Sequence, residues 1–517
     1  MSGTSADIIV HNANVITVDP TRPRARLVAI KGNKILAVDS RDDPERYRGP
    51  QTRLINCRGR TVIPGFNDAH CHIMSLADIL SYVDCSRMKS IAEIQTAIQG
   101  RASQTPAGNW VTGAGYNEFY LVEKRHPTRW ELDQASPSNP VRLLHRTWHA
   151  TVLNSLGMKQ LGISGETTEP SGGIIERDLE TGEPNGVLYD MNFYLKDKLP
   201  PEPDEKIIQH ITEANHLYLS QGITSLQDAT VTNDLVRWQT FQRLKASGKL
   251  ASRLSFMVGM EVLPRLVEQG MSPACGNEQS RLGGIKIVIT QTTGVLHPSQ
   301  DELNRQVLEA QQAGFPVAIH AIEESSLEAA IIALEYAQTQ GRKDGWQRHR
   351  IEHASECSPP LLSRLKVLRP IIVSQPPFIY YSGERYLREV PPEQRPWLYR
   401  FRSLWDCGLC LAASSDSPVV PNNPLVGIYA AVTRRAEIGE LLGTEESLSV
   451  EQALIAYTLN GAFASGEEKI KGSISVGKLA DLVVLSADPT AVPAEAIKDI
   501  RVEMTILDGR IAWQQAE

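Results

Sequence analysis

The stretch TVIPGFNDAHCHI, residues 61–73, joins an apolar run, a Pro-Gly turn and the histidine pair His70 and His72. Side chains two residues apart project to the same side of an extended chain, so both imidazoles face one direction at the end of a strand. Imidazole nitrogens are common metal ligands, and two of them can bind one ion. Two surface histidines in a loop would have the same spacing, so the remainder of the chain has to distinguish the two interpretations.

The composition is that of an ordinary globular protein, with 41% apolar and 22% charged residues among 517. No apolar run approaches the roughly 18 residues of a membrane span, and the N-terminus lacks the pattern of an export signal. A net charge of -7 without a basic stripe argues against nucleic acid and membrane partners, so a small-molecule substrate is expected. The seven cysteines are irregularly spaced, which is typical of reduced thiols in the cytoplasm. Assembly into a homo-oligomer is left open.

The two ends of the chain share one pattern. Residues 1–60 and 472–517 both alternate apolar and polar positions, with tight-turn signals such as Asp508-Gly509. Neither segment has enough strands to bury a face alone, so we expect them to form one composite β-sandwich.

Between the ends, apolar strands alternate with helical stretches, which is typical of a parallel sheet with crossover helices. The expected strands are 61–70, 223–229, 253–260, 284–290, 316–322, 349–354, 370–377 and 409–416. Eight such units predict an α/β fold of the (β/α)8 TIM barrel type over residues 61–75 and 211–471. Residues 76–210 are too long for one crossover and rich in Pro and Gly, so they are predicted to be an insertion covering the barrel mouth.

Candidate ligands recur at the ends of these strands, where the side chains of a barrel converge on one face. They are His70, His72, Lys286, His320, His353 and Asp416. Each has a structural alternative, because a core histidine or a turn aspartate is common. Lys286 is unusual, since an amine inside a buried strand needs a partner or a chemical change. A neutral lysine that takes up carbon dioxide becomes a carbamate able to bridge two cations. Their common register favours the functional interpretation.

Several passages carry a resemblance to a known family, among them VIPGFNDAHCH, PVAIHAI, HRIEHAS and GSISVGKLADLVVLSADP. The chain resembles the amidohydrolase superfamily, in the amidohydrolase-3 branch that contains the D-aminoacylases and N-substituted formamide deformylase. The resemblance implies a hydrolase of a non-peptide C-N bond that uses one or two divalent ions, with zinc as the first candidate. It also implies that His70, His72 and Asp416 hold one ion and His320 and His353 the other. A carboxylated Lys286 (N6-carboxylysine) would bridge them.

The expected chemistry follows from the charge of the ions, because a divalent cation lowers the pKa of bound water from 15.7 to about 7. Asp416 would accept the proton of that water and pass it to the departing nitrogen. Many relatives follow the strand-four lysine with Asp-Gly, whereas this chain continues from Lys286 with Ile-Val-Ile-Thr. A mononuclear site with one further histidine therefore stays open. Asp68 and Glu352 are candidates for orienting the imidazoles.

The substrate contacts are expected in two segments and at Tyr116. The run QPPFIYYSGERYL after strand seven is interpreted as a loop at the catalytic face, and Trp148 and His149 lie in an insert segment that matches the family. The residues proposed as contacts are Tyr116, Trp148, His149, Phe378, Tyr381 and Arg385. Amide, N-acyl, formamide and cyclic amide substrates all remain open. So do isomerisation, decarboxylation or ester hydrolysis by the same centre, and a metal-binding protein without activity.

Overall fold

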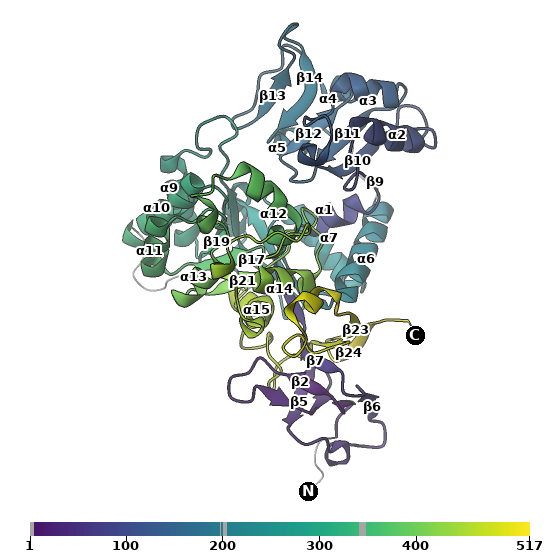
Figure 1. The fold of residues 1–517 in the computed structure, drawn as a ribbon, viewed down its shortest axis with the longest axis vertical. Helices are drawn as coiled ribbons and strands as arrows, with labels where there is room; N and C mark the ends of the chain where they lie inside the picture. The colour runs from purple at the N-terminus through teal and green to yellow at the C-terminus, as the bar shows by residue number, and fades with distance from the viewer. Residues whose placement is uncertain (1–4, 197, 200–203, 274, 341–347, 517) are drawn as a thin grey trace.

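The centre of the molecule is an eight-stranded parallel sheet (Figure 1). The computed structural model describes residues 5–196, 198–199, 204–273, 275–340 and 348–516. In spatial order the strands are β8 (Phe66–Cys71), β15 (Ile223–Asp228), β16 (Arg253–Gly259), β17 (Ser280–Val288), β18 (Val317–Ala321), β19 (Arg350–His353), β20 (Ile371–Ser374) and β21 (Leu411–Ala413). The amide of Asp416 donates to the carbonyl of His70 at 2.8 Å, and the amide of His72 donates to that of Ser417 at 2.8 Å. These two bonds join the last strand to the first, and the predicted barrel is confirmed.

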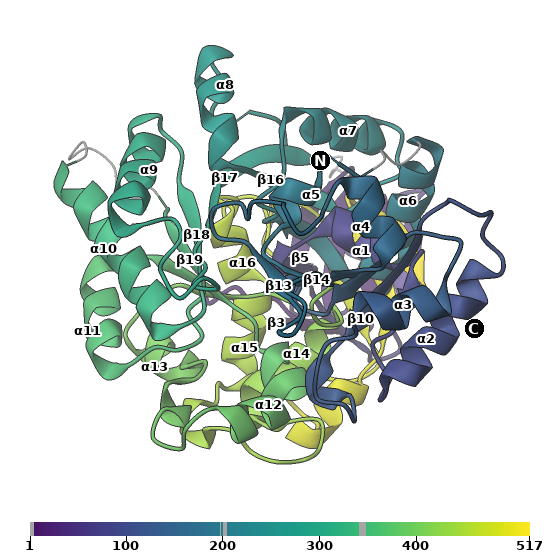
Figure 2. The same ribbon diagram turned by 90° about the horizontal axis from the view of Figure 1, so that it is seen from above.

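Helices surround the strands on the outside, as Figure 2 shows from above. They are α1 (Ile73–Ile79), α6 (Asp204–Ser220), α7 (Leu235–Ala246), α8 (Leu263–Glu268), α9 (Gln300–Gln312), α10 (Glu324–Gln340), α11 (Pro359–Leu368), α12 (Pro377–Glu389), α13 (Phe401–Asp406), α14 (Pro424–Thr433), α15 (Val450–Tyr457) and α16 (Leu459–Ala464). Helix α9 shows why such a segment of the sequence forms a helix that packs on the barrel. Ser299 caps its first turn by accepting from the amide of Glu302, and Leu303, Val307 and Ala310 form its buried stripe.

The expected strand 61–70 divides into two strands at Gly65. Strand β7 (Thr61–Pro64) pairs with strands of the flanking sheet, and only β8 belongs to the barrel. The physical reason lies at the junction, where a Cβ atom on Gly65 would lie 2.1 Å from Oγ1 of Thr224. A residue without a side chain is needed for the chain to pass this closely from one sheet to the other.

Both ends of the chain build the flanking sheets, as predicted. One sheet contains β5 (Lys34–Asp39), β4 (Leu27–Lys31), β1 (Ile8–His11) and β6 (Arg53–Asn56). The other contains β24 (Arg510–Gln514), β23 (Val502–Leu507), β22 (Leu482–Leu485), β7, β2 (Asn14–Ile16) and β3 (Arg24–Ala25). Val28, Val62 and Leu482 pack into one core shared by the two sheets. The N-terminal and C-terminal segments are therefore folded as a single unit.

The segment between α1 and α6 forms a further sheet with its own buried core. Its strands are β13 (Ile174–Arg177), β14 (Pro184–Tyr189), β12 (Ala150–Leu153), β11 (Val141–His145), β10 (Val111–Tyr116) and β9 (Val83–Asp84). Its helices are α2 (Ile91–Ala102), α3 (Arg129–Ala135), α4 (Ser155–Leu161) and α5 (Asn192–Lys196). Figure 1 shows this insertion at the end of the barrel opposite the terminal sheets. Within the described ranges, no helix combines the length and apolar character that crossing a membrane requires.

Candidate metal centre

The six candidate ligands meet at the carboxyl ends of the barrel strands. The closest group is His70, His72 and Asp416, whose ligand atoms all lie within 4.8 Å of one another. Oδ1 of Asp416 lies 3.0 Å from Nε2 of His72 and 3.4 Å from Nε2 of His70. Two imidazoles and a carboxylate at such distances can hold a divalent cation.

A second group of side chains adjoins the first. The ring centroids of His320 and His353 are 4.4 Å apart, and those of His70 and His353 are 5.0 Å apart. Lys286 lies in β17 among these rings, and its amine is buried. Strands β8, β17, β18 and β19 therefore bring together residues separated by up to 283 positions in the chain, from His70 to His353.

Each of three imidazoles is oriented through its Nδ1 atom. Nδ1 of His70 donates to the carboxylate of Glu352, which in turn accepts from Nε of Arg350 at 2.6 Å. Nδ1 of His353 donates to Oε1 of Gln375 at 2.7 Å. His72 is held in the same way, with Nδ1 2.8 Å from the hydroxyl oxygen of Thr230. Such outer hydrogen bonds leave Nε2 directed at the centre and fix the ring.

Glu352 and Asp68 were both expected to orient imidazoles, and the structure separates them. Glu352 contacts His70, whereas Asp68 accepts from the amide of Ser415 at 2.9 Å and from its hydroxyl at 2.5 Å. Asp68 thus fixes the residue that immediately precedes Asp416. Gln375 and Thr230 were missed by sequence reasoning, although each follows a barrel strand by one or two positions and could have been found from that signal.

The backbone is strained at two of these positions. Asp416 has a φ of 58° and His353 a φ of 71°, in the left-handed region that residues with a side chain rarely adopt. Such strain persists where the surrounding contacts over-determine the conformation, and it is concentrated at functional sites. Here it turns both side chains toward the same point.

Burial and neighbouring charges keep the candidate ligands in protonation states that can bind a metal ion. Burial lowers the pKa of His70 to about 3, and it also lowers the pKa of His320 and His353, so these imidazoles are neutral near pH 7. Burial alone would raise the pKa of Asp416, but its contacts with His70 and His72 bring it below its usual range. Burial lowers the pKa of Lys286 to about 8.

Two buried nitrogens at the centre lack a hydrogen-bond partner among the described residues. They are Nζ of Lys286 and Nε2 of His353. A buried polar atom without a partner costs about 1–3 kcal/mol. Neutral imidazoles, an ionised carboxylate and an amine that can become a carbamate together fit a site for divalent cations.

A cavity of about 1420 Å³ opens above these residues. Its floor includes His70, His72, Lys286, His320 and Asp416, and part of its wall comes from the insertion. This volume exceeds the roughly 300–1,000 Å³ of an ordinary ligand pocket, so the cavity accommodates a small-molecule substrate with space for solvent.

Two of the six expected substrate contacts line this cavity, namely Trp148 and His149. Nδ1 of His149 lies 2.6 Å from Oδ1 of Asp190, and the carboxylate of Asp190 also accepts from the hydroxyl of Thr292 on the barrel side. The ring centroid of His149 is 6.0 Å from that of His320. Asp190 was missed because no local pattern connects it with His149.

The other four expected contacts lie outside the cavity lining. The expected loop after strand seven is helix α12, in which Phe378 is buried against Tyr399 and Arg385 stacks on Tyr386. Tyr381 packs edge-on against its neighbour Tyr380. Tyr116 is buried inside the insertion, with its hydroxyl 2.8 Å from Nδ1 of His126. Helix α12 is amphipathic and buries Phe378 in the core of the barrel, whereas a loop would have left it at the mouth.

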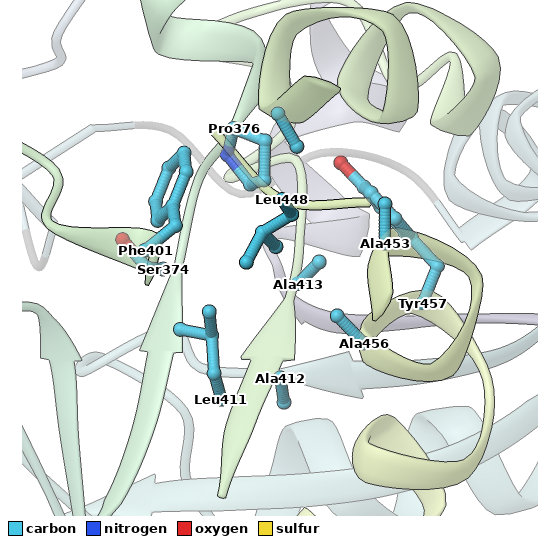
Figure 3. A pocket seen from close by; sticks show the side chains of 11 residues that line it. Ser374, Pro376, Phe401, Leu411, Ala412, Ala413, Leu448, Ala453, Ala456 and Tyr457 are labelled. Carbon is cyan, nitrogen blue, oxygen red and sulfur yellow. The ribbon is translucent and has the colours of Figure 1, made fainter. Parts of the chain in front are cut away.

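A much smaller apolar void lies apart from the centre (Figure 3). It occupies about 10 Å³ between β20, β21 and α15, and Leu411, Ala413 and Tyr457 are among its lining residues. Such a space has room for at most one water molecule, so it is a packing defect of the core.

The comparisons with known proteins agree with this geometry. A model of the amidohydrolase family matches residues 53–512. The chain is 28% identical to N-substituted formamide deformylase of Arthrobacter pascens over 98% of both chains. It is 27% identical to the putative amidohydrolase YtcJ of Bacillus subtilis (strain 168) over 98% of this chain and 99% of that protein. The solved structure of an uncharacterized metal-dependent hydrolase from Pyrococcus horikoshii OT3 superposes with a TM-score of 0.75 at 24% identity, covering 94% of this chain and 99% of that one.

Proposed function

The chain belongs to the amidohydrolase family, and we propose that it hydrolyses a non-peptide C-N bond of a small molecule with the help of bound divalent metal. The observation that carries this proposal is the convergence of His70, His72 and Asp416 on one point at the floor of a large cavity. Amide, N-acyl, formamide and cyclic amide substrates fall within the proposal. Similarity along the full length of a formamide deformylase makes N-substituted formamides the first compounds to test.

In the proposed centre, His70, His72 and Asp416 would hold one ion, and His320 and His353 would hold a second. Lys286, as its carbamate, would be a ligand shared by both. The unpartnered nitrogens of Lys286 and His353 support the second site, because a single ion held by His70, His72 and Asp416 alone leaves both of them buried without a partner among the described residues. Zinc suits this set of imidazole and carboxylate ligands. When bound, such ions polarise a carbonyl and lower the pKa of water to about 7.

Asp416 is proposed to move the proton. Its carboxylate is ionised and faces the cavity beside His70 and His72. One oxygen can accept the proton of the attacking water and then deliver it to the departing nitrogen. The left-handed backbone at Asp416 and the two bonds from Ser415 to Asp68 hold the carboxylate in that position.

His149 is proposed to contact the reacting carbonyl oxygen from the opposite side. Burial alone would lower the pKa of His149, but the hydrogen bond and charge of Asp190 raise it overall. A protonated ring with Nδ1 engaged by Asp190 has Nε2-H as its remaining donor. That donor can stabilise negative charge that develops on the substrate oxygen. Trp148, the neighbouring residue in the cavity wall, is proposed as an apolar contact.

The seven cysteines are all free thiols, which supports the proposed reducing, cytoplasmic compartment. The same centre could serve isomerisation, decarboxylation or ester hydrolysis, and these are the rival activities.

The test is a metal analysis combined with a substrate screen. Protein purified without chelator is expected to carry at least one equivalent of transition metal, and the His70→Ala/His72→Ala variant is expected to lose it. The loaded enzyme is then screened against formamides, N-acyl amino acids and cyclic amides, with release of amine or acid as the readout. Full metal in the double variant overturns the centre. Turnover of esters alone overturns the C-N assignment.

A further inference from the structure

One arginine of the insertion faces the cavity with a buried nitrogen that no described residue engages. Arg142 lies on β11, between Val141 and Leu143, which are buried in the core of the insertion. Because side chains alternate along a strand, Arg142 points to the opposite face, and there it lines the cavity. Thr112, its register neighbour on β10, lines the cavity beside it.

The guanidinium of Arg142 is in an unusual state for a half-buried charge. Its Nε is buried and has no hydrogen-bond partner within the described ranges. Burial lowers the pKa of Arg142, and the charges of Tyr82 and Asp78 partly offset this. Nearby Arg101, by contrast, already donates to the carbonyl of Ser81 at 3.1 Å. Buried arginines ordinarily have an acceptor, and none of the described residues supplies one to this nitrogen.

Helix α1 sets the length scale between this arginine and the proposed metal centre. His72 caps its N-terminus, and Ser75 and Asp78 line the cavity along the helix. Asp78 is six residues beyond His72, which corresponds to about 9 Å at 1.5 Å per residue. Val83, four residues beyond the end of α1, pairs with Gly113 of β10, which in turn pairs with Leu143 of β11, so Arg142 lies two strand spacings from that end of the helix. An extended chain of roughly eight bonds spans this length.

We infer that Arg142, with the hydroxyl of Thr112, is a subsite for a carboxylate that the substrate carries remote from its scissile C-N bond. The inference rests on the proposed hydrolase function and specifies its substrate class. The planar guanidinium pairs with a carboxylate through two parallel hydrogen bonds. A carboxylate carries one negative charge, which matches the single positive charge of the guanidinium. Trp110, also in the wall, provides an apolar surface for the chain that leads there.

Two pairs of probes test the subsite. The first pair is 6-formamidohexanoate and its neutral carboxamide, whose chain matches the estimated distance. The second pair is N-formylglycine and its carboxamide, in which the carboxylate is too close to the formyl group to reach Arg142. For the metal-loaded enzyme, kcat/KM is expected to be about tenfold to a hundredfold higher for 6-formamidohexanoate than for its carboxamide. Arg142→Gln is expected to abolish that preference and to leave both glycine compounds unaffected.

Controls separate a ligand contact from general charge and from a structural role. Arg101→Gln removes the same charge from the same wall and is expected to keep the preference within about twofold, because its guanidinium is already engaged. Arg142→Gln is expected to melt at or above the wild-type temperature, since its buried Nε makes no hydrogen bond within the described part of the chain that could be lost. A preference unchanged in Arg142→Gln, or lost equally in Arg101→Gln, overturns the subsite.

A binding measurement keeps the two proposals distinguishable. If neither formamide is hydrolysed, calorimetry with 6-formamidohexanoate and its carboxamide decides the subsite without turnover. Tighter binding of the carboxylate that disappears in Arg142→Gln supports the subsite even where the hydrolase proposal fails for formamides. Equal binding of both compounds by the wild-type protein overturns it.

Discussion

Nδ1 of His149 lies 2.6 Å from Oδ1 of Asp190, and the ring centroid of His149 lies 6.0 Å from that of His320. Both members of this pair come from the insertion, whereas His320 belongs to the barrel. The insertion therefore contributes an oriented imidazole to a centre whose other candidate residues are supplied by barrel strands.

Replacing Asp190 by Asn is expected to change the pH dependence of the reaction. Asp190 raises the pKa of His149, so its loss lowers that pKa. If the protonated ring is the active form, activity falls as the pH rises through the pKa of His149. The alkaline limb of the kcat/KM profile is therefore expected to move to lower pH in Asp190→Asn. Metal content should stay at the wild-type level, and an unmoved limb contradicts the role of the pair.

Asp416→Asn tests the proton transfer. The amide keeps an oxygen that can coordinate, so the variant is expected to retain metal while kcat falls by a factor of about 10²–10⁴. Metal analysis and steady-state kinetics on the same preparation are the measurements. Activity near the wild-type level would remove Asp416 from the proton pathway.

Lys286 is expected to react with carbon dioxide, because its pKa of about 8 leaves much of the amine neutral at mildly alkaline pH. Below that pKa the amine is protonated and cannot attack. Reconstitution of the metal-stripped protein should therefore be faster at pH 9 than at pH 7 and should depend on bicarbonate. Labelling with ¹³C-bicarbonate is expected to give a carbamate signal that is absent from Lys286→Ala. Full activity of Lys286→Ala without added short carboxylic acids excludes the bridge.

Glu352→Gln tests the outer hydrogen bond to His70. Loss of the charged acceptor is expected to weaken metal affinity about 10-fold to 100-fold, measured by competition with a chelator. Glu356→Gln is the matched control, since its carboxylate accepts from the amide of Glu324 and serves a neighbouring helix. Equal affinities of the two variants would contradict the orienting role of Glu352.

Gly65→Ala is expected to destabilise the protein by about 1–3 kcal/mol, because the new methyl group overlaps Thr224. Gly100 provides the comparison. It lies inside α2 with nothing within 4 Å of the position that a methyl group would take, so Gly100→Ala should stabilise by about 0.5–1 kcal/mol. Chemical denaturation of both variants checks the difference, and adding Thr224→Gly to Gly65→Ala should recover part of the loss.

The sequence predicted the barrel and the meeting of its candidate ligands because both depend on strand order and on strand ends. His320 and His353 could be placed together from their positions alone. The division of the first expected strand at Gly65 was not predicted, because Thr61–Pro64 is as apolar as a barrel strand and only its pairing assigns it to the terminal sheet. Aromatic residues of α12 were expected in a loop, since composition does not reveal which face of a helix is buried.

Pairs that join separate elements were beyond sequence reasoning. His149 and Asp190 lie 41 positions apart, on either side of several strands, and no spacing rule connects them. The proposed subsite at Arg142 could not be predicted either, because the sequence does not show whether an arginine on a strand has a hydrogen-bond partner. Such relationships depend on tertiary packing.

The hydrogen bond from the amide of Asp416 to the carbonyl of His70 closes the barrel at its seam. The proposed metal centre straddles that seam, since Asp416 comes from one edge and His70 and His72 from the other. A bound ion would link these two edges of the barrel, and separating the edges would also separate the ligands. Metal release and opening of the barrel are then thermodynamically linked. The free energy of unfolding should therefore increase as the free metal concentration rises.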